Sequence, residues 1–529
     1  MEAEKVFYNG TIYTMEKPGE VYEALAVNFG RIVACGTSEE MLKINAVEKI
    51  DLQGKVVLPG FIDSHQHILS YTKGRQSVNL RGAKSWEEVK ARLAERVAST
   101  PKGGWIKGTS FNHEDWEDPF LPTRKELDEI SKDHPILISR YCMHIHVANT
   151  LALAAAGIDR NYKPSPENSV QFDEKGDPTG ILFENAVTPV LNVIPDPLAT
   201  DEAKKEALAE VLRDISSYGI TGVHTIQGKF CDAEEFLYLY QELEAEGRLP
   251  LRLYVGFDEY PSFGMVTGFG NEKIRYGFYK IYSDGSLGSR AAKLFEPYSD
   301  MPGHTGVLNY SQEEINAMCQ KAYDMNLQIA IHAIGDKGLD VALNAIEKVY
   351  YANPKPNQRF RLVHVMCVNE DLIARMKNLP VVLDIQPKFV SSNVKWSEKR
   401  LGPERSKYAY AWRRLLDEGF IISAGSDSPV EPYNPFLGIY GVVTRQDLEG
   451  YPEGGWYPEQ RVTVYEAIEM YTKNSAYAAF EENIKGTIKP GKLADFIVVD
   501  QNPFTIDSKG LKDIKIEKTY LGGEEVYSA

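Results

Sequence analysis

The chain lacks any long apolar run, any basic excess and any cysteine pairing motif. No run of about 18 apolar residues occurs, so we expect no membrane-spanning helix. Lys and Arg number 59 against 75 Asp and Glu, a net charge of −16, which argues against binding to nucleic acid or to an anionic membrane. The opening MEAEKVFYNG has no basic segment followed by an apolar one, so we expect no signal peptide.

Cysteine is scarce and its positions form no framework. The five cysteines are odd in number and include no C-x-x-C pair: Cys35, Cys142, Cys231, Cys319 and Cys367. We therefore expect reduced thiols in a cytoplasmic protein. The 529 residues, 43% of them hydrophobic and 25% charged, are typical of a folded chain with one large domain and appendages, or of two to three domains.

The two ends of the chain are predicted to be short strands joined by turns. Residues 1–57 and 483–529 mix β-branched and aromatic residues with turn residues, and Thr519–Tyr527 is typical of a hairpin. Neither end is large enough to bury a core alone. We expect both ends to complete one small β-sandwich beside a central domain, residues 58–482.

The central domain alternates between strand-like and helix-like segments. The expected strands are Val56–His67, Gly222–Gly228, Leu251–Phe257, Phe278–Asp284, Gln328–Gly335, Arg361–Val368, Val381–Pro387 and Ile421–Asp427. Eight strands with intervening helices predict an α/β fold, a (β/α)8 TIM-like barrel. Two further strand-like runs, Trp105–Asn112 and Ile136–Tyr141, exceed that number. They predict an insertion domain at about 72–200, between the first and second barrel strands.

The strongest chemical signal is the run Asp63-Ser-His-Gln-His67 at the end of the first barrel strand. Side chains alternate along a strand, so Asp63, His65 and His67 are expected on one face. Two imidazoles one pleat apart can bind the same divalent metal, or they can pack and hydrogen-bond in the core. Asp63 could orient an imidazole or could accept a backbone N–H.

Three further strand ends favour the metal hypothesis. His332, His364 and Asp427 end the fifth, sixth and eighth expected strands. A single histidine on an apolar strand is more often a core residue. The catalytic residues of such barrels lie at the carboxyl ends of their strands, however, and here four of the ten histidines and a carboxylate reach that edge together.

Lys280 is the sixth candidate, because alternation in the fourth strand places Phe278, Lys280, Tyr282 and Asp284 on one face. If that face points inward, a buried ammonium is costly unless it is paired or neutralised. Desolvation lowers a lysine pKa, and the resulting amine can react with CO2 to give a carbamate, an anionic ligand able to bridge two cations. Alternatively, Lys280 faces outward or pairs with Asp284.

Together these motifs resemble the amidohydrolase superfamily. The resemblance includes H-A-I-G-D at 332–336, G-S-D at 425–427 and the closing stretch Gly486–Asp500, and it extends over essentially the whole chain. The stretches Lys280–Arg290 and Gly180–Glu184 are similar to amidohydrolase family 3, the YtcJ-like and N-substituted-formamide-deformylase-like branch.

The resemblance implies a centre of two divalent cations, zinc foremost, with iron, manganese or cobalt as alternatives. The implied ligands are His65, His67 and Asp427 for the more buried ion, His332 and His364 for the other, and a carboxylated Lys280 that bridges both. It implies hydrolysis of a non-peptide C–N bond, of amide or N-formyl type, in a small molecule. Metal-activated hydroxide would attack, with Asp427 as the proton shuttle.

Two other functions remain open. A one-metal deaminase of the same superfamily would use the four histidines and Asp427 but needs no strand-four lysine. A metal-free scaffold or binding protein would be signalled by lost ligands, and all six are present. A homodimer is the expected assembly. Substrate contacts or ordinary surface and core roles stay open for seven residues: His113, His144, His146, His224, His304, Arg290 and Glu184.

Overall fold

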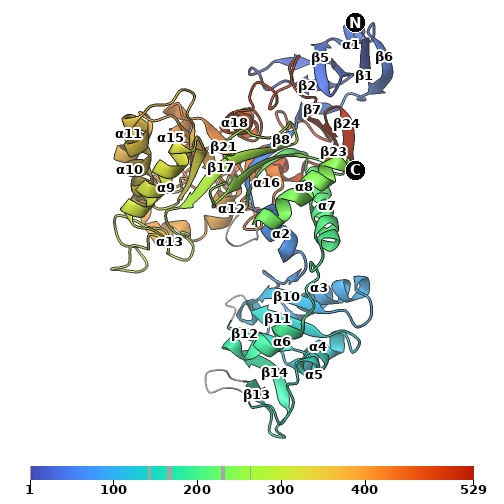
Figure 1. The fold of residues 1–529 in the computed structure, drawn as a ribbon, viewed down its shortest axis with the longest axis vertical. Coiled ribbons are helices and arrows are strands. Elements are labelled where there is room, and N and C mark those ends of the chain that lie inside the picture. The colour runs from blue at the N-terminus through green and yellow to red at the C-terminus, as the bar shows by residue number, and fades with distance from the viewer. Residues whose placement is uncertain (1, 141–143, 164–169, 228–232, 262–263) are drawn as a thin grey trace. The chain divides into compact units, whose positions relative to one another are not determined.

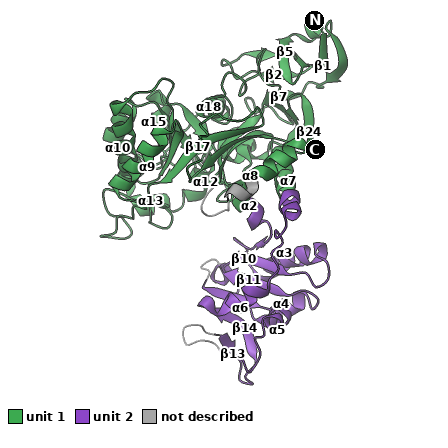
Figure 2. Cartoon of the chain, in the orientation of Figure 1, with its two compact units in different colours: residues 1–70, 208–529 green, residues 71–207 purple. Residues whose placement is uncertain are grey.

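The computed structural model describes residues 2–529 except 141–143, 164–169, 228–232 and 262–263. The chain divides into two compact units (Figure 2). One comprises Met1–Ser70 with Leu208–Ala529, and the other comprises Tyr71–Ala207. Among the described residues, no helix is long and apolar enough to cross a membrane.

The larger unit contains a sheet of eight parallel strands, which confirms the expected barrel (Figure 1). Its strands are, in order, β8 (Phe61–Gln66), β15 (Ile220–Gln227), β16 (Arg252–Phe257), β17 (Ile274–Tyr282), β18 (Gln328–Ala333), β19 (Phe360–His364), β20 (Val381–Ile385) and β21 (Ile422–Ala424). A parallel bridge between Gln66 and Ser428 brings the end of the last strand back to the first, so the ring is nearly closed. Gly228 of the expected second strand lies outside the described residues.

Helices lie between the barrel strands. They include α7 (Asp201–Ser217), α8 (Ala233–Ala245), α9 (Gln312–Asp324), α10 (Asp336–Ala352), α11 (Glu370–Met376) and α15 (Trp412–Asp417). Helix α9 begins with a capping box in which the Ser311 hydroxyl accepts from the Glu314 N–H and the Glu314 carboxylate accepts from the Ser311 N–H. The strands that these helices cover are almost continuously apolar and buried, as is typical of parallel sheets.

Two further sheets of this unit are built from the ends of the chain. The first is β5 (Arg31–Gly36), β4 (Ala24–Asn28), β1 (Glu2–Tyr8) and β6 (Asn45–Asp51); the second is β24 (Glu524–Ser528), β23 (Ile516–Leu521), β22 (Phe496–Val499), β7 (Val56–Pro59), β2 (Thr11–Tyr13) and β3 (Val21–Tyr22). Phe7, Phe496 and Tyr520 pack together with ring centroids 4.7 to 5.1 Å apart. Residues from both ends of the chain therefore share one core.

The smaller unit has its own sheet of six strands and its own core. The strands are β13 (Val170–Phe172), β14 (Pro178–Phe183), β12 (Ile145–Ala148), β11 (Ile136–Arg140), β10 (Ile106–Phe111) and β9 (Val78–Asn79). Helices α3 (Trp86–Ser99), α4 (Arg124–Ile130) and α5 (Thr150–Ala155) pack in the same unit. Strands β10 and β11 correspond to the two extra strand-like runs of the sequence, although Tyr141 lies outside the described residues.

Candidate metal centre

Strand β8 carries His65 near its carboxyl end, and His67 directly follows the strand. Its residues are all buried, and its register against β15 shifts inside the histidine motif. Val223 lies opposite Asp63, whereas Thr225 lies opposite Gln66, so β8 carries one extra residue there. Side chains therefore do not alternate strictly between the two faces from Asp63 to His65. Alternation along the strand alone no longer predicts that Asp63, His65 and His67 share one face.

His65, His67 and Asp427 come together although more than 350 positions separate the histidines from the aspartate, as their numbers show. His65 Nε2 and His67 Nε2 each lie 3.2 Å from Asp427 Oδ1. One ligand atom from each residue lies within 4.8 Å of the others. The Asp427 N–H also donates to the His65 carbonyl oxygen at 2.7 Å, which fixes the loop after β21 against β8. Two imidazole nitrogens and one carboxylate oxygen are a ligand set that zinc and similar cations prefer.

His332 and His364 lie beside this cluster without joining its group of ligand atoms. The His65 and His364 rings are 5.3 Å apart, and the His364 and His332 rings are 4.4 Å apart. His332 Nε2 faces the Asp284 carboxylate at 3.3 Å, and His364 Nδ1 is hydrogen-bonded to the Gln386 side-chain oxygen. The structure therefore brings all four expected histidines into one row of contacting rings.

Lys280 is buried on β17, with 1% of its surface exposed. Its Nζ has no hydrogen-bond partner among the described residues and lies 5.3 Å from the centre of the Tyr282 ring. Burial lowers the pKa of Lys280 to about 7, against the opposing pull of the Asp427 and Asp384 carboxylates. The sequence left open that Lys280 faces outward, and in the structure the side chain is buried.

Asp284 does not pair with Lys280, because backbone groups occupy its carboxylate. Its Oδ1 accepts the Ile334 N–H at 3.1 Å, and its Oδ2 accepts the N–H groups of Gly335 and Lys293 at 2.8 and 2.9 Å. A Cβ on Gly338 would lie 2.5 Å from Asp284 Oδ2, so that glycine leaves room for the carboxylate. Asp284 thereby holds the loop that directly follows β18, the strand that carries His332.

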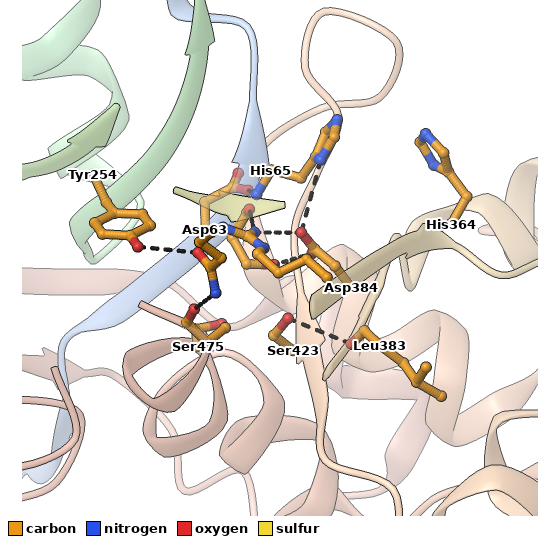
Figure 3. Close-up of polar contacts among 12 residues, drawn as sticks. Asp63, His65, Tyr254, His364, Leu383, Asp384, Ser423 and Ser475 are labelled. Carbon is orange, nitrogen blue, oxygen red and sulfur yellow. Dashed lines mark hydrogen bonds and ion pairs between the residues drawn. The ribbon is translucent and has the colours of Figure 1, made fainter. Parts of the chain in front are cut away.

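Of the two roles expected for Asp63, the structure shows that it accepts hydrogen bonds from backbone N–H groups. Its Oδ1 accepts the N–H groups of His65 at 3.1 Å and of Ser426 at 2.9 Å, and burial raises its pKa to about 7. At the Nδ1 side of the His65 ring lies Asp384, whose Oδ2 is 3.8 Å from His65 Nδ1 (Figure 3). Sequence reasoning missed Asp384, for which the one signal is a single acid in the apolar strand β20.

The unassigned histidines of the smaller unit have partners within that unit. His144 Nδ1 lies 2.9 Å from the exposed Glu184 carboxylate, and buried His146 is hydrogen-bonded to the Ser139 hydroxyl at 2.8 Å. His113 packs against the aromatic rings of the smaller core.

In the larger unit, Arg290 forms an ion pair with Asp300, with Nη2 and Oδ2 2.8 Å apart. His304 Nε2 is hydrogen-bonded to the Arg290 carbonyl oxygen at 2.8 Å. His224 is fully buried on β15, and neither of its ring nitrogens has a hydrogen-bond partner among the described residues. The structure does not bring His224, His304 or Arg290 into the His65, His67 and Asp427 cluster.

Comparison with known proteins places this chain in a family. A model of the amidohydrolase family matches residues 48–527. The chain belongs to the amidohydrolase family. The resemblance drawn from its motifs is thereby confirmed, and so is its assignment as a hydrolase.

Several relatives of this amidohydrolase cover almost its whole length. It is 34% identical to amidohydrolase YtcJ of Bacillus subtilis over 99% of both chains. It is 27% identical to the N-substituted formamide deformylase of Arthrobacter pascens, over 97% of this chain and 96% of the relative. Among solved structures, an uncharacterized metal-dependent hydrolase of Pyrococcus horikoshii matches with a TM-score of 0.74 and 32% identity, over 95% of this chain and 99% of that one.

Proposed function

We propose that this amidohydrolase hydrolyses a non-peptide C–N bond, of amide or N-formyl type, in a small molecule. The observation that carries the proposal is the buried amine of Lys280, which has no hydrogen-bond partner in the described part of the chain, together with the cluster of His65, His67 and Asp427. The formamide deformylase similarity over nearly the whole chain supports an N-formyl group as one substrate type to test first.

The residues present fit a pair of divalent cations, zinc foremost. His65, His67 and Asp427 would hold one cation, and His332 and His364 would hold the other. Lys280, as a carbamate, would be a ligand of both cations. Its neutral amine would attack the carbon of CO2: an N–C bond forms, one C=O π bond opens to leave the negative charge on oxygen, and the nitrogen releases one proton to solvent. The product would be an anionic ligand in place of a buried amine that has no hydrogen-bond partner among the described residues.

When bound, such cations supply an activated water and polarise the scissile carbonyl. Asp427 would accept the proton of the attacking water and return it to the departing nitrogen, so that one water is consumed and an acid and an amine leave. Burial opposes ionisation of Asp427, but the hydrogen bonds from His65 and His67 outweigh it and hold its pKa well below the usual range. The side chain keeps 12% of its surface exposed, which leaves it accessible to a substrate.

Metal content per chain, measured by elemental mass spectrometry on protein purified without chelators, tests this proposal. We expect about two cations per chain in the wild type and about one in Lys280→Met. Lys485→Met is the matched control, because Lys485 is also buried but forms an ion pair with Glu481. A screen of amides and N-formyl amines on the loaded protein then tests the reaction, and the absence of hydrolysis across both classes would contradict it.

A one-metal deaminase of the same superfamily is the second candidate. The three residues whose ligand atoms cluster tightly suffice for one cation with the neighbouring histidines. An adenine deaminase of Petrotoga mobilis is 38% identical over 69 residues, 13% of this chain. About one cation per chain in both the wild type and Lys280→Met would favour this candidate, and no cation in either would favour a scaffold.

A further inference from the structure

A buried ion pair lies next to His65. Asp384 on β20 and Arg361 on β19 are both fully buried, and Arg361 Nη2 donates to Asp384 Oδ2. Arg361 Nη2 also donates to the Ser64 carbonyl oxygen at 2.6 Å, and the Ser64 hydroxyl donates to Asp384 Oδ1 at 2.5 Å. Both members of the pair are thus hydrogen-bonded to Ser64, the residue directly before His65.

The His65 ring is oriented by this arrangement on one side and by Asp427 on the other. Its Nε2 lies 3.2 Å from Asp427 Oδ1, and its Nδ1 lies 3.8 Å from Asp384 Oδ2 (Figure 3). Nδ1 has no hydrogen-bond partner among the described residues. An imidazole that binds a cation through Nε2 carries its proton on Nδ1, and a nearby carboxylate is the usual acceptor of that proton.

We propose that Asp384, held in place by Arg361, is the positioning residue that keeps His65 in the tautomer with Nε2 free to bind a cation. This inference rests on the proposed function, because it concerns His65 as a ligand. Asp63, the acceptor considered from sequence, cannot take this role with Oδ1, which already accepts two backbone N–H groups.

Arg361 is what keeps Asp384 able to accept. A fully buried carboxylate without a cation would be protonated rather than charged. Arg361 Nη2 donates to Asp384 Oδ2, so the buried carboxylate has a cationic partner beside it. The Arg361 guanidinium also packs over the Phe278 ring, with the guanidinium carbon 4.4 Å from the centre of the ring. Apolar residues of similar volume often stabilise a core as well as a buried ion pair does, so stability alone does not explain this pair.

The test compares Asp384→Asn with Asp495→Asn. The control removes a carboxylate from an equally buried pair, in which Arg252 Nε and Asp495 Oδ2 are 2.7 Å apart and His65 is not involved. Cation affinity is measured by competition with a chelator, and the absorption spectrum of the cobalt-loaded protein reports the ligand geometry. We expect Asp384→Asn to bind zinc roughly 10- to 100-fold more weakly and to change the cobalt spectrum, and Asp495→Asn to do neither.

Asp384→Asn leaves Arg361 unpaired, so the double variant Asp384→Asn with Arg361→Gln is a second test that buries no lone charge. We expect the same loss of affinity in it. NMR of the zinc-loaded wild type labelled with 15N-histidine needs no variant, and we expect a proton on His65 Nδ1.

Wild-type affinity and an unchanged cobalt spectrum in the variants, or a His65 Nδ1 without its proton, would overturn this inference and leave the proposed function standing. A wild type that binds no cation would overturn both.

Discussion

Replacing Asp495 by asparagine should lower the free energy of unfolding by about 3 to 5 kcal/mol. Asp495 precedes β22 of the terminal sheets, whereas Arg252 lies on β16 of the barrel, so their pair joins the sandwich to the barrel within one unit. Both side chains are only 5% exposed, and two hydrogen bonds of 2.7 and 2.9 Å connect them. Asparagine keeps the volume and loses the charge, which leaves the Arg252 guanidinium buried and unpaired.

The same pair predicts how this loss depends on pH. Burial opposes ionisation of Asp495, but the charge of Arg252 outweighs it and lowers the pKa. A carboxyl whose folded pKa is lowered contributes its stability above the unfolded pKa, about 3.9, and loses it as the pH falls through the folded value. The difference between wild type and variant should therefore be largest near neutral pH and should shrink below about pH 4.

Urea unfolding followed by circular dichroism measures both effects. Glu524→Gln is the control, because Glu524 pairs with Lys5 at 2.6 Å in the same terminal region but is 74% exposed. Exposed pairs contribute about 0 to 1 kcal/mol, so this variant should unfold almost as the wild type does. Equal and small losses of unfolding free energy in both variants would refute the reasoning that burial makes the Arg252 and Asp495 pair important for stability.

Two further predictions concern the proposed metal centre and the loop beside it. If the proposed function holds, Asp427→Asn should keep the fold and most of the metal that the wild type binds but lose about 10²- to 10⁴-fold in kcat, because the proposed proton acceptor is gone; near-normal turnover would exclude the shuttle role. Gly338→Ala should lower the free energy of unfolding by about 1 to 3 kcal/mol, since its Cβ would lie 2.5 Å from Asp284 Oδ2. Thermal unfolding checks the second prediction, and Gly247→Ala, with nothing within 4 Å but a positive φ of 70°, separates overpacking from backbone strain.

The sequence predicted the barrel well because its signals are local. Parallel strands buried on both faces are mostly apolar, as in Ile329-Ala330-Ile331 of β18, and each such run is visible without knowing its neighbours. The positions of His332, His364 and Asp427 at strand ends follow from the same runs. A barrel gathers the carboxyl ends of its strands at one edge, so their proximity could be inferred before any coordinates.

Asp384 shows what could not be predicted. One acid in the run Val381–Ile385 is locally indistinguishable from a strand-end residue. Its meaning depends on Arg361 and Ser64, which lie 23 and 320 positions away and meet it through strand pairing and the curvature of the sheet. The extra residue in β8 is likewise set by pairing with β15, and alternation read from sequence cannot detect it.

The sequence by itself determined the fold class, the family and which residue types reach the barrel edge, because these depend on hydrophobic period and on short motifs. The tertiary structure decided which side chains meet. It buried the Lys280 amine with no hydrogen-bond partner among the residues described, assigned Asp63 and Asp284 to backbone N–H groups, and placed the Arg361 and Asp384 pair beside His65. The physical reason is that burial and hydrogen-bond partnership belong to pairs of residues distant along the chain, and folding alone brings those pairs into contact.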